Sequence, residues 1–230
     1  MDRRDACETR EFTAMRTCSW LPTPRPFPDW IRGREFGVHS RVVDIDEDEV
    51  VWDAHIRIPV HPLVGVLGTA PLLEAISTID NGPHGGNVDV PEFGPGCRVY
   101  LPVAVADALF YLGDCHAVQG DGELCGIGAI EIRTHTTVRL DLAPRPADMR
   151  WLRFETATHI GAVAFARPLE DAFRFAAEEL VRCLEEAYGM SPPESVLLLG
   201  QVAEARAAQI VNPKCSFVCK IARSFLPSAT

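Results

Sequence analysis

The sequence predicts an α+β protein that is mainly β, built as a jelly-roll-like β-sandwich with a C-terminal helical hairpin. Two observations support this class. Between residues 34 and 166, short runs of β-branched and apolar residues alternate partially with polar ones and are separated by turns rich in glycine and proline. From residue 167 onward, the apolar residues recur instead at helical spacing. Strands followed by helices, without regular alternation between them, are typical of the α+β class.

The same change in pattern divides the chain into three parts. We expect an irregular segment over 1–33, a β-rich body over 34–166 that carries the functional site, and a helical part over 167–230 that packs on the body. Alternating prolines from Pro22 to Pro28 disfavour a helix in the first part. In the body, the acidic run over 46–49 predicts a hairpin connection, and strand-like alternation extends over 124–142.

The third part predicts two helices joined by a very short turn, which would make them antiparallel. The first is expected between Pro168 and Gly189, residue types that commonly begin and end helices. The second is expected over 191–211, with Ser191 as the N-cap. This prediction places Glu204 in the middle of a helix, facing solvent or Arg206.

Composition and charge restrict the classes of function. The net charge of -10 at pH 7 argues against general electrostatic binding to nucleic acid or to an anionic membrane, because both require a positive surface. The first residues lack the apolar segment of a secretory signal, and no apolar run reaches the roughly 20 residues of a membrane span. We therefore expect a cytoplasmic protein whose eight cysteines are reduced.

The stretch GDCHAVQGDGELCG, residues 113–126, is the first candidate site. Asp114 and His116 are two apart on a predicted strand and should lie on one side of it, while Asp121 and Glu123 follow a glycine-hinged turn. One imidazole with carboxylates can bind Zn²⁺ or another divalent ion, whereas an all-oxygen set favours Ca²⁺. The alternative is a solvated acidic turn, and spacing alone does not decide between the two.

The segment NGPHGGNVD, residues 81–89, is the second candidate. Gly85 and Gly86 would let backbone N–H groups approach a bound oxygen, as an oxyanion hole requires, and Asn87 and Asp89 add polar groups beside them. All these residue types are also common in plain loops, which is the favoured interpretation of the segment taken alone.

Glu131 is a third candidate, on a predicted strand between Ile130 and Ile132. A glutamate that alternates with apolar residues commonly lies on the solvated face of a strand. If this glutamate is buried instead, it could act as a general base.

Several stretches together resemble the acetamidase/formamidase family. They are HPLVGVLGTAP (61–71), HGGNVD (84–89), residues 99–126, residues 129–131 and the C-terminal residues 187–213. The most specific part is the His-Ala-x-Gln-Gly-Asp-Gly-Glu core of the first candidate loop. Two departures accompany the resemblance: we expect this chain to lack the family's usual N-terminal β segment, and Glu204 stands where the family often has aspartate.

The resemblance implies metal-dependent hydrolysis of short aliphatic amides, such as formamide or acetamide, to a carboxylic acid and ammonia. It also implies a homo-oligomer, and we expect zinc as the divalent metal, with calcium as the alternative. The alternative function is that of a catalytically impaired relative that binds a metal or small ligand, or of one subunit of a split amidase.

The resemblance places the family's functional positions at Asn87, Asp89, Asp114, His116, Asp121, Glu123 and Glu131. The roles are our inference from the residue types: we assign metal binding to His116, Asp114, Asp121 and Asp89, catalysis to Glu123, Glu131 and Asn87, and stabilisation of the substrate oxyanion to Gly85 and Gly86.

Overall fold

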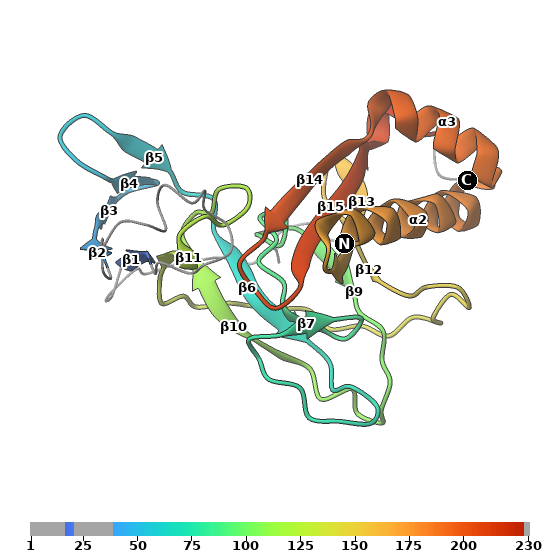
Figure 1. Cartoon of the computed structure of the whole chain (residues 1–230), viewed down its shortest axis with the longest axis horizontal. Coiled ribbons are helices and arrows are strands. Elements are labelled where there is room, and N and C mark those ends of the chain that lie inside the picture. The colour runs from blue at the N-terminus through green and yellow to red at the C-terminus, as the bar shows by residue number, and fades with distance from the viewer. Residues whose placement is uncertain (1–16, 21–38, 228–230) are drawn as a thin grey trace.

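Residues 17–20 and 39–227 are described by the structure, a computed structural model of the chain (Figure 1). The fold is mainly β, with antiparallel sheets and two α-helices near the C-terminus, which confirms the predicted class. Among the described residues, neither helix has both the length and the apolar character that crossing a lipid bilayer would require.

The described strands form three sheets. The largest has the order β2-β1-β11-β10-β6-β8-β7, the second β14-β15-β13-β12-β9, and the third β3-β4-β5. The first sheet contains β1 (Thr17–Trp20), β2 (His39–Val42), β6 (Leu63–Gly68), β7 (Asn81–Gly82), β8 (Gly85–Asn87), β10 (Tyr111–His116) and β11 (Gly126–Glu131). The second contains β9 (Arg98–Tyr100), β12 (Leu152–Glu155), β13 (His159–Ala166), β14 (Glu204–Gln209) and β15 (Cys215–Ala222). The third contains β3 (Asp44–Asp46), β4 (Glu49–Val51) and β5 (Arg57–Pro59).

The two larger sheets pack face to face, and helix α2 (Leu169–Tyr188) covers the outer face of the second sheet (Figure 1). Strand β13 shows this layering through its period of two. Its Val163 and Phe165 pack in the core between the sheets, whereas Ala162 and Ala164 pack against the helix. Burying a side chain such as Phe165 contributes about 1.5–3 kcal/mol of hydrophobic stabilisation.

Helix α2 has the predicted limits. It follows Pro168 and ends at Gly189, which has a left-handed conformation at φ 65° and donates its N–H to the carbonyl of Glu185. Its buried residues Ala172, Ala176, Leu180 and Leu184 form the stripe that the sequence spacing predicts. Helix α3 (Pro192–Val202) begins at Ser191, whose hydroxyl caps the helix by accepting from Glu194 N, as predicted. A short 3₁₀ helix, η1 (Arg223–Phe225), follows β15.

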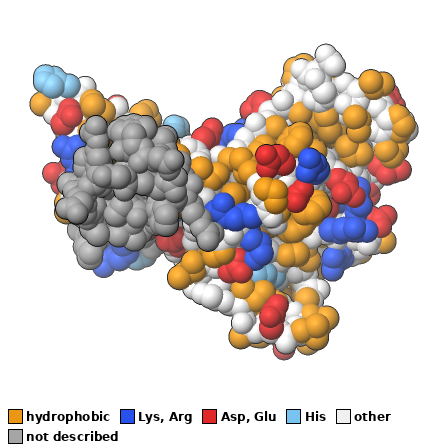
Figure 2. Space-filling model, in the orientation of Figure 1, with side chains coloured by type: hydrophobic (Ala, Val, Ile, Leu, Met, Phe, Trp, Pro, Cys, Tyr) orange, Lys and Arg blue, Asp and Glu red, His pale blue; other side chains and the backbone are white. Residues whose placement is uncertain are grey.

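The predicted second helix is correct only as far as Val202. Residues Glu204–Gln209 form strand β14 instead, antiparallel to β15, although their composition favours a helix. Pairing with a neighbouring strand therefore overrides local propensity here. Glu204 is not in a helix, and its carboxylate contacts His159 Nε2 at 3.0 Å. Figure 2 shows hydrophobic side chains on the surface of α3, where Leu197 is 73% exposed.

Two other regions differ from the predicted pattern. The strand-like alternation over 124–142 forms a strand only from Gly126 to Glu131, and the chain that follows runs without a strand to residue 151. Of the predicted irregular segment 1–33, the described residues Thr17–Trp20 form β1, which pairs with β11 and β2. The rest of that segment lies outside the described residues.

Candidate functional site

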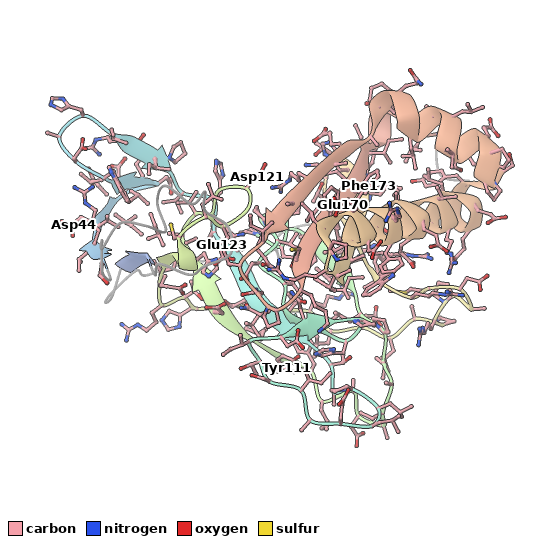
Figure 3. The ribbon with its side chains drawn as sticks, in the orientation of Figure 1. Asp44, Tyr111, Asp121, Glu123, Glu170 and Phe173 are labelled. Carbon is pink, nitrogen blue, oxygen red and sulfur yellow. The ribbon has the colours of Figure 1, made fainter. Side chains whose placement is uncertain are left out.

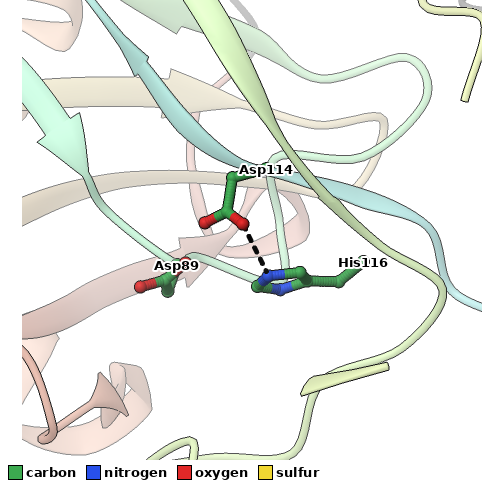
Figure 4. Close-up of side chains that lie close together, drawn as sticks. All are labelled: Asp89, Asp114 and His116. Atoms are coloured by element: carbon green, nitrogen blue, oxygen red, sulfur yellow. Dashed lines mark ion pairs between the residues drawn. The ribbon is translucent and has the colours of Figure 1, made fainter. Parts of the chain in front are cut away.

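Three side chains from two separate stretches of the sequence converge beside the seven-stranded sheet (Figure 4). Asp89 follows β8, while Asp114 and His116 come from β10, where the period of two places them on one side as expected. One ligand atom of each residue lies within 4.8 Å of those of the other two. The cluster therefore has the dimensions of a site for a single cation.

Asp89 reaches this position because the chain bends over Gly65 of β6. The Gly65 carbonyl accepts hydrogen bonds from the backbone N–H groups of Val88 (2.9 Å) and Asp89 (3.0 Å). Asp89 itself adopts a left-handed conformation at φ 47°, which is uncommon for a residue other than glycine. The Gln119 side chain holds the bend by donating from Nε2 to the Asp89 carbonyl at 2.8 Å.

His116 is the most buried member of the cluster, with an exposed fraction of 0%. Its Nδ1 lies 3.0 Å from Gln119 Oε1, an acceptor, so that Nδ1 carries a proton and Nε2 is the ring nitrogen that faces the cluster. Among the described residues, Nε2 has no hydrogen-bond partner. It faces Glu131 Oε1 at 3.3 Å and Asp114 Oδ1 at 3.7 Å, the ion pair drawn in Figure 4.

The cluster carries an excess of negative charge, and the titration of its groups reflects this. Burial lowers the pKa of His116, but the carboxylates of Asp114, Glu131 and Asp89 outweigh burial and raise it to about 11. Contact with His116 lowers the pKa of Asp114. The electrostatic field that favours a proton on His116 would equally favour a metal cation.

The two buried acids, Asp89 and Glu123, have raised pKa values, in contrast to Asp114. Burial raises the pKa of Asp89 to about 6. Burial and the neighbouring charge of Asp89 raise the pKa of Glu123 to about 9. Glu123 is 5% exposed, hydrogen-bonds to Asp89 through its side chain, and leaves Oε2 without a partner among the described residues.

Two amide side chains orient the carboxylates. Asn212 donates from Nδ2 to Asp89 Oδ2 at 2.7 Å. Asn87, with its amide nitrogen turned toward the acids, donates to Asp114 Oδ2 at 3.1 Å and to Asp89 at 3.2 Å. The structure thus brings the predicted Asn87 to the cluster. Asn212 was not among the predicted site residues, because it lies 123 positions from Asp89 in the sequence and reaches it only through the fold.

Asp121 is not brought to the cluster. It lies on the same loop as Glu123 (Figure 3), but its largely exposed carboxylate pairs with Arg206 of β14. Between these two acids, Gly122 fastens the loop to the end of β14: its N–H donates to the Ala207 and Ala208 carbonyls, and its own carbonyl accepts from Ile210 N. The turn therefore directs Glu123 inward and Asp121 outward.

The predicted oxyanion glycines lie within the sheet. Strand β8 is hydrogen-bonded between β6 and β7, with Gly85 and Gly86 at the paired positions. Both have φ +100°, and a Cβ on Gly86 would lie 2.3 Å from the Asp80 carbonyl oxygen. Glycine is required at both positions because β6, β7 and β8 approach one another closely there.

The donor set fits a divalent ion with mixed ligands. A buried imidazole nitrogen without a partner and two carboxylates are the ligand types that zinc takes in sites with three protein ligands, where a fourth position stays open. Glu131, with its side chain 34% exposed, contacts the same nitrogen from β11. The fold and the site together define a β-sandwich protein with a buried histidine–carboxylate cluster.

Comparison with known proteins shows the family of this chain. A family model described as "Acetamidase/Formamidase family" matches residues 71–212, and the chain belongs to this family. The resemblance predicted from the sequence is thereby confirmed.

Individual relatives agree. The chain is 41% identical over 69 residues to a formamidase of Methylophilus methylotrophus, covering 30% of this chain and 17% of that protein. It is 40% identical over 90 residues to an acetamidase of Mycolicibacterium smegmatis, covering 35% and 22%. These matches span about a fifth of the length of the curated relatives.

Solved structures match over more of the chain. An acetamidase of Bacillus halodurans superposes with a TM-score of 0.83 at 30% identity, covering 97% of this chain and 76% of that one. An acetamidase of Yersinia enterocolitica gives 0.86 at 30% identity, covering 97% and 70%.

Proposed function

We propose that this protein hydrolyses short aliphatic amides, such as formamide or acetamide, to the carboxylic acid and ammonia with the help of a divalent cation, zinc in the first instance. Family membership supports the reaction class. The observation that carries the metal is the fully buried His116 Nε2, which faces carboxylates without a hydrogen bond of its own.

Asp89, Asp114 and His116 would hold the cation. When bound, it would polarise the amide carbonyl and lower the pKa of a water molecule to about 7. Asn87 and Asn212 keep the two aspartates in place through the hydrogen bonds described above. Gln119 fixes the tautomer of His116 in which Nε2 is the available donor atom.

The remaining carboxylates would handle protons. In the reaction, the water oxygen bonds to the carbonyl carbon, the C–N bond breaks, and nitrogen gains the water proton and leaves as ammonia. Glu131 is partly exposed beside His116 and could accept that proton and return it to nitrogen. Glu123 is enclosed against Asp89, where it would orient that ligand. We therefore place proton transfer at Glu131 and not at Glu123.

The test is elemental analysis of the purified protein followed by an ammonia assay with formamide and acetamide. His116→Ala should remove both the bound metal and ammonia release, while the circular dichroism spectrum keeps its native form. His135→Ala, at an exposed histidine, is the matched control and should retain both. Undiminished ammonia release by His116→Ala would refute the assignment.

The same assay separates the alternative functions. A metal- or ligand-binding relative without catalysis would retain the ion and release no ammonia from any short amide. One subunit of a split amidase would gain activity when a second polypeptide is added. The predicted homo-oligomer and cytoplasmic location stay predictions, which light scattering and cell fractionation can test.

A further inference from the structure

We infer that Gly65 is a positioning residue of the cation site, because the missing side chain at this strand position leaves the space in which Asp89 and Asp114 approach each other. The inference rests on the proposed function, since it concerns how the same cluster is assembled. Gly65 lies in the middle of β6, and none of the sequence motifs assigned a role to it.

The space above the Gly65 Cα is where the two carboxylates meet. A Cβ built on this residue would lie 2.6 Å from Asp89 Oδ1 and 2.9 Å from Asp114 Oδ2, and 2.8 Å from the Asp114 carbonyl oxygen. All three distances are shorter than an ordinary van der Waals contact of about 3.4 Å. A methyl group at this position would therefore push the two acids apart.

Backbone conformation does not explain this glycine. Its φ lies outside the left-handed region, so an L-residue could adopt the same conformation. Gly86 on the neighbouring strand differs, because its φ is +100° and the atom nearest to its Cβ would be the Asp80 carbonyl oxygen, which belongs to none of the proposed ligands. Gly65 is thus distinguished by what its absent side chain would touch, and those atoms belong to two of the three proposed ligands.

The carbonyl of Gly65 acts on the same ligand. By accepting from both Val88 N and Asp89 N, it pulls the chain after β8 toward β6 and brings Asp89 over the bare Cα. The Gly65 carbonyl therefore positions Asp89, and the absence of a side chain on Gly65 leaves room for the Asp89 carboxylate. A change of a few tenths of an ångström between ligand atoms matters, because changes to groups that support metal ligands typically cost 10–100-fold in affinity.

The experiment compares Gly65→Ala with Gly113→Ala after metal removal, using zinc titrations against a competing chelator. Gly113 is a strand glycine next to Asp114, and a Cβ there meets nothing within 4 Å. Gly65→Ala should bind zinc about 10–100-fold more weakly than the wild type, whereas Gly113→Ala should bind it with unchanged affinity. Both metal-free variants should unfold cooperatively, Gly65→Ala at a lower temperature than Gly113→Ala because its methyl group also displaces the Asp114 carbonyl oxygen.

A double-mutant cycle provides a second readout that loss of stability would not reproduce. In an Asp114→Ala background, a methyl group at position 65 has one carboxylate fewer to displace, so that it should weaken zinc binding less than it does in the wild type. An equal effect in both backgrounds would overturn the inference.

The remaining outcomes also decide. Wild-type affinity in Gly65→Ala, or a metal-free Gly65→Ala that no longer folds, would overturn the role of Gly65 and leave the proposed function standing. A wild-type protein that binds no zinc would instead contradict the proposed function itself.

Discussion

Two groups of buried charges in this molecule differ in how completely their charges are matched. Between the five-stranded sheet and α2, Glu179 is 1% exposed and accepts hydrogen bonds from Arg153 Nε (2.6 Å) and from the backbone N–H groups of Arg150 and Trp151. Arg153 also reaches Glu186 at 2.9 Å. The buried Glu179 carboxylate is therefore balanced by the Arg153 guanidinium and by two backbone N–H donors.

The cluster around His116 is not balanced in this way. Asp89, Asp114, Glu123 and Glu131 surround a single imidazole, and the described residues place no lysine or arginine within ion-pair distance of these four acids. Buried charge without a partner is costly, so proteins retain such arrangements mainly where something binds. The charges of the first group are thus matched within the fold, whereas those of the second are not, and the proposed cation would supply the positive charge that the second group lacks.

The largest expected effect comes from breaking the balanced group. Arg153→Met leaves Glu179 buried without its cation and should lower the free energy of unfolding by about 3–5 kcal/mol in urea titrations. Arg174→Met, at an exposed ion pair on the same helix, is the control and should change it by less than about 1 kcal/mol.

Removing one charge from the cluster around His116 should not lower the free energy of unfolding. Asp89→Asn keeps the shape of the side chain and removes one repelling charge, so that the metal-free protein should be as stable as the wild type or more stable. A loss as large as that of Arg153→Met would show that the two groups do not differ.

Adding the proposed cation should have the next largest effect. Zinc at 100 times its dissociation constant should raise the free energy of unfolding of the wild type by about 2.7 kcal/mol. In Asp89→Asn the same zinc concentration should give a much smaller increase, measured by thermal melts with and without zinc. Equal increases in both proteins would place the ion elsewhere.

A smaller effect should appear in the pH dependence of the metal-free protein. The pKa of Glu123 is raised from 4.5 to about 9 and that of His116 from 6.5 to about 11, so between pH 6.5 and 9 the folded state holds more protons than the unfolded state at both groups. Stability should therefore fall as pH rises through this window. Zinc affinity should rise over the same window, because metal and proton compete for the ligands.

Urea titrations of the metal-free protein at several pH values, with Glu123→Gln for comparison, measure this slope. The variant should lose the part due to Glu123 and show a shallower decline. Stability that instead increases with pH would contradict the unbalanced charge of the cluster.

The smallest effect is expected for Asp121, which the sequence assigned to the metal. Because its carboxylate is exposed and paired with Arg206, Asp121→Asn should change the free energy of unfolding by at most about 1 kcal/mol and leave zinc affinity unchanged. A loss of affinity comparable with that of Asp89→Asn would restore Asp121 to the ligand set.

The sequence predicted those features that depend on short-range rules. The limits of α2 follow from Pro168 and Gly189, and the shared side of Asp114 and His116 follows from strand alternation. The strand β14 could not be predicted from its own residues, because Glu204–Gln209 has a helical composition and becomes a strand only through pairing with β15. The predicted class of fold was correct because most segments obey their local pattern.

The site was predictable in its residue types and less so in its membership. Gly120 and Gly122 on either side of Asp121 indicated a turn, but not which of Asp121 and Glu123 the turn directs inward. That depends on the hydrogen bonds of Gly122 to β14. Asn212 and Gly65 act through contacts with Asp89 that no local pattern records. Long-range contacts thus complete a site that local spacing can only suggest.

The attachment of Gly122 to β14 has a consequence for the solubility of the protein. β14 is the outer strand of its sheet, and such strands can recruit strands of other molecules through their unused backbone groups. Here Gly122 already bonds to the Ala207 and Ala208 carbonyls near the C-terminal end of β14. Glu204 and Arg206 place charges along the rest of the strand. The turn that directs Glu123 inward therefore also limits aggregation through the exposed edge of β14.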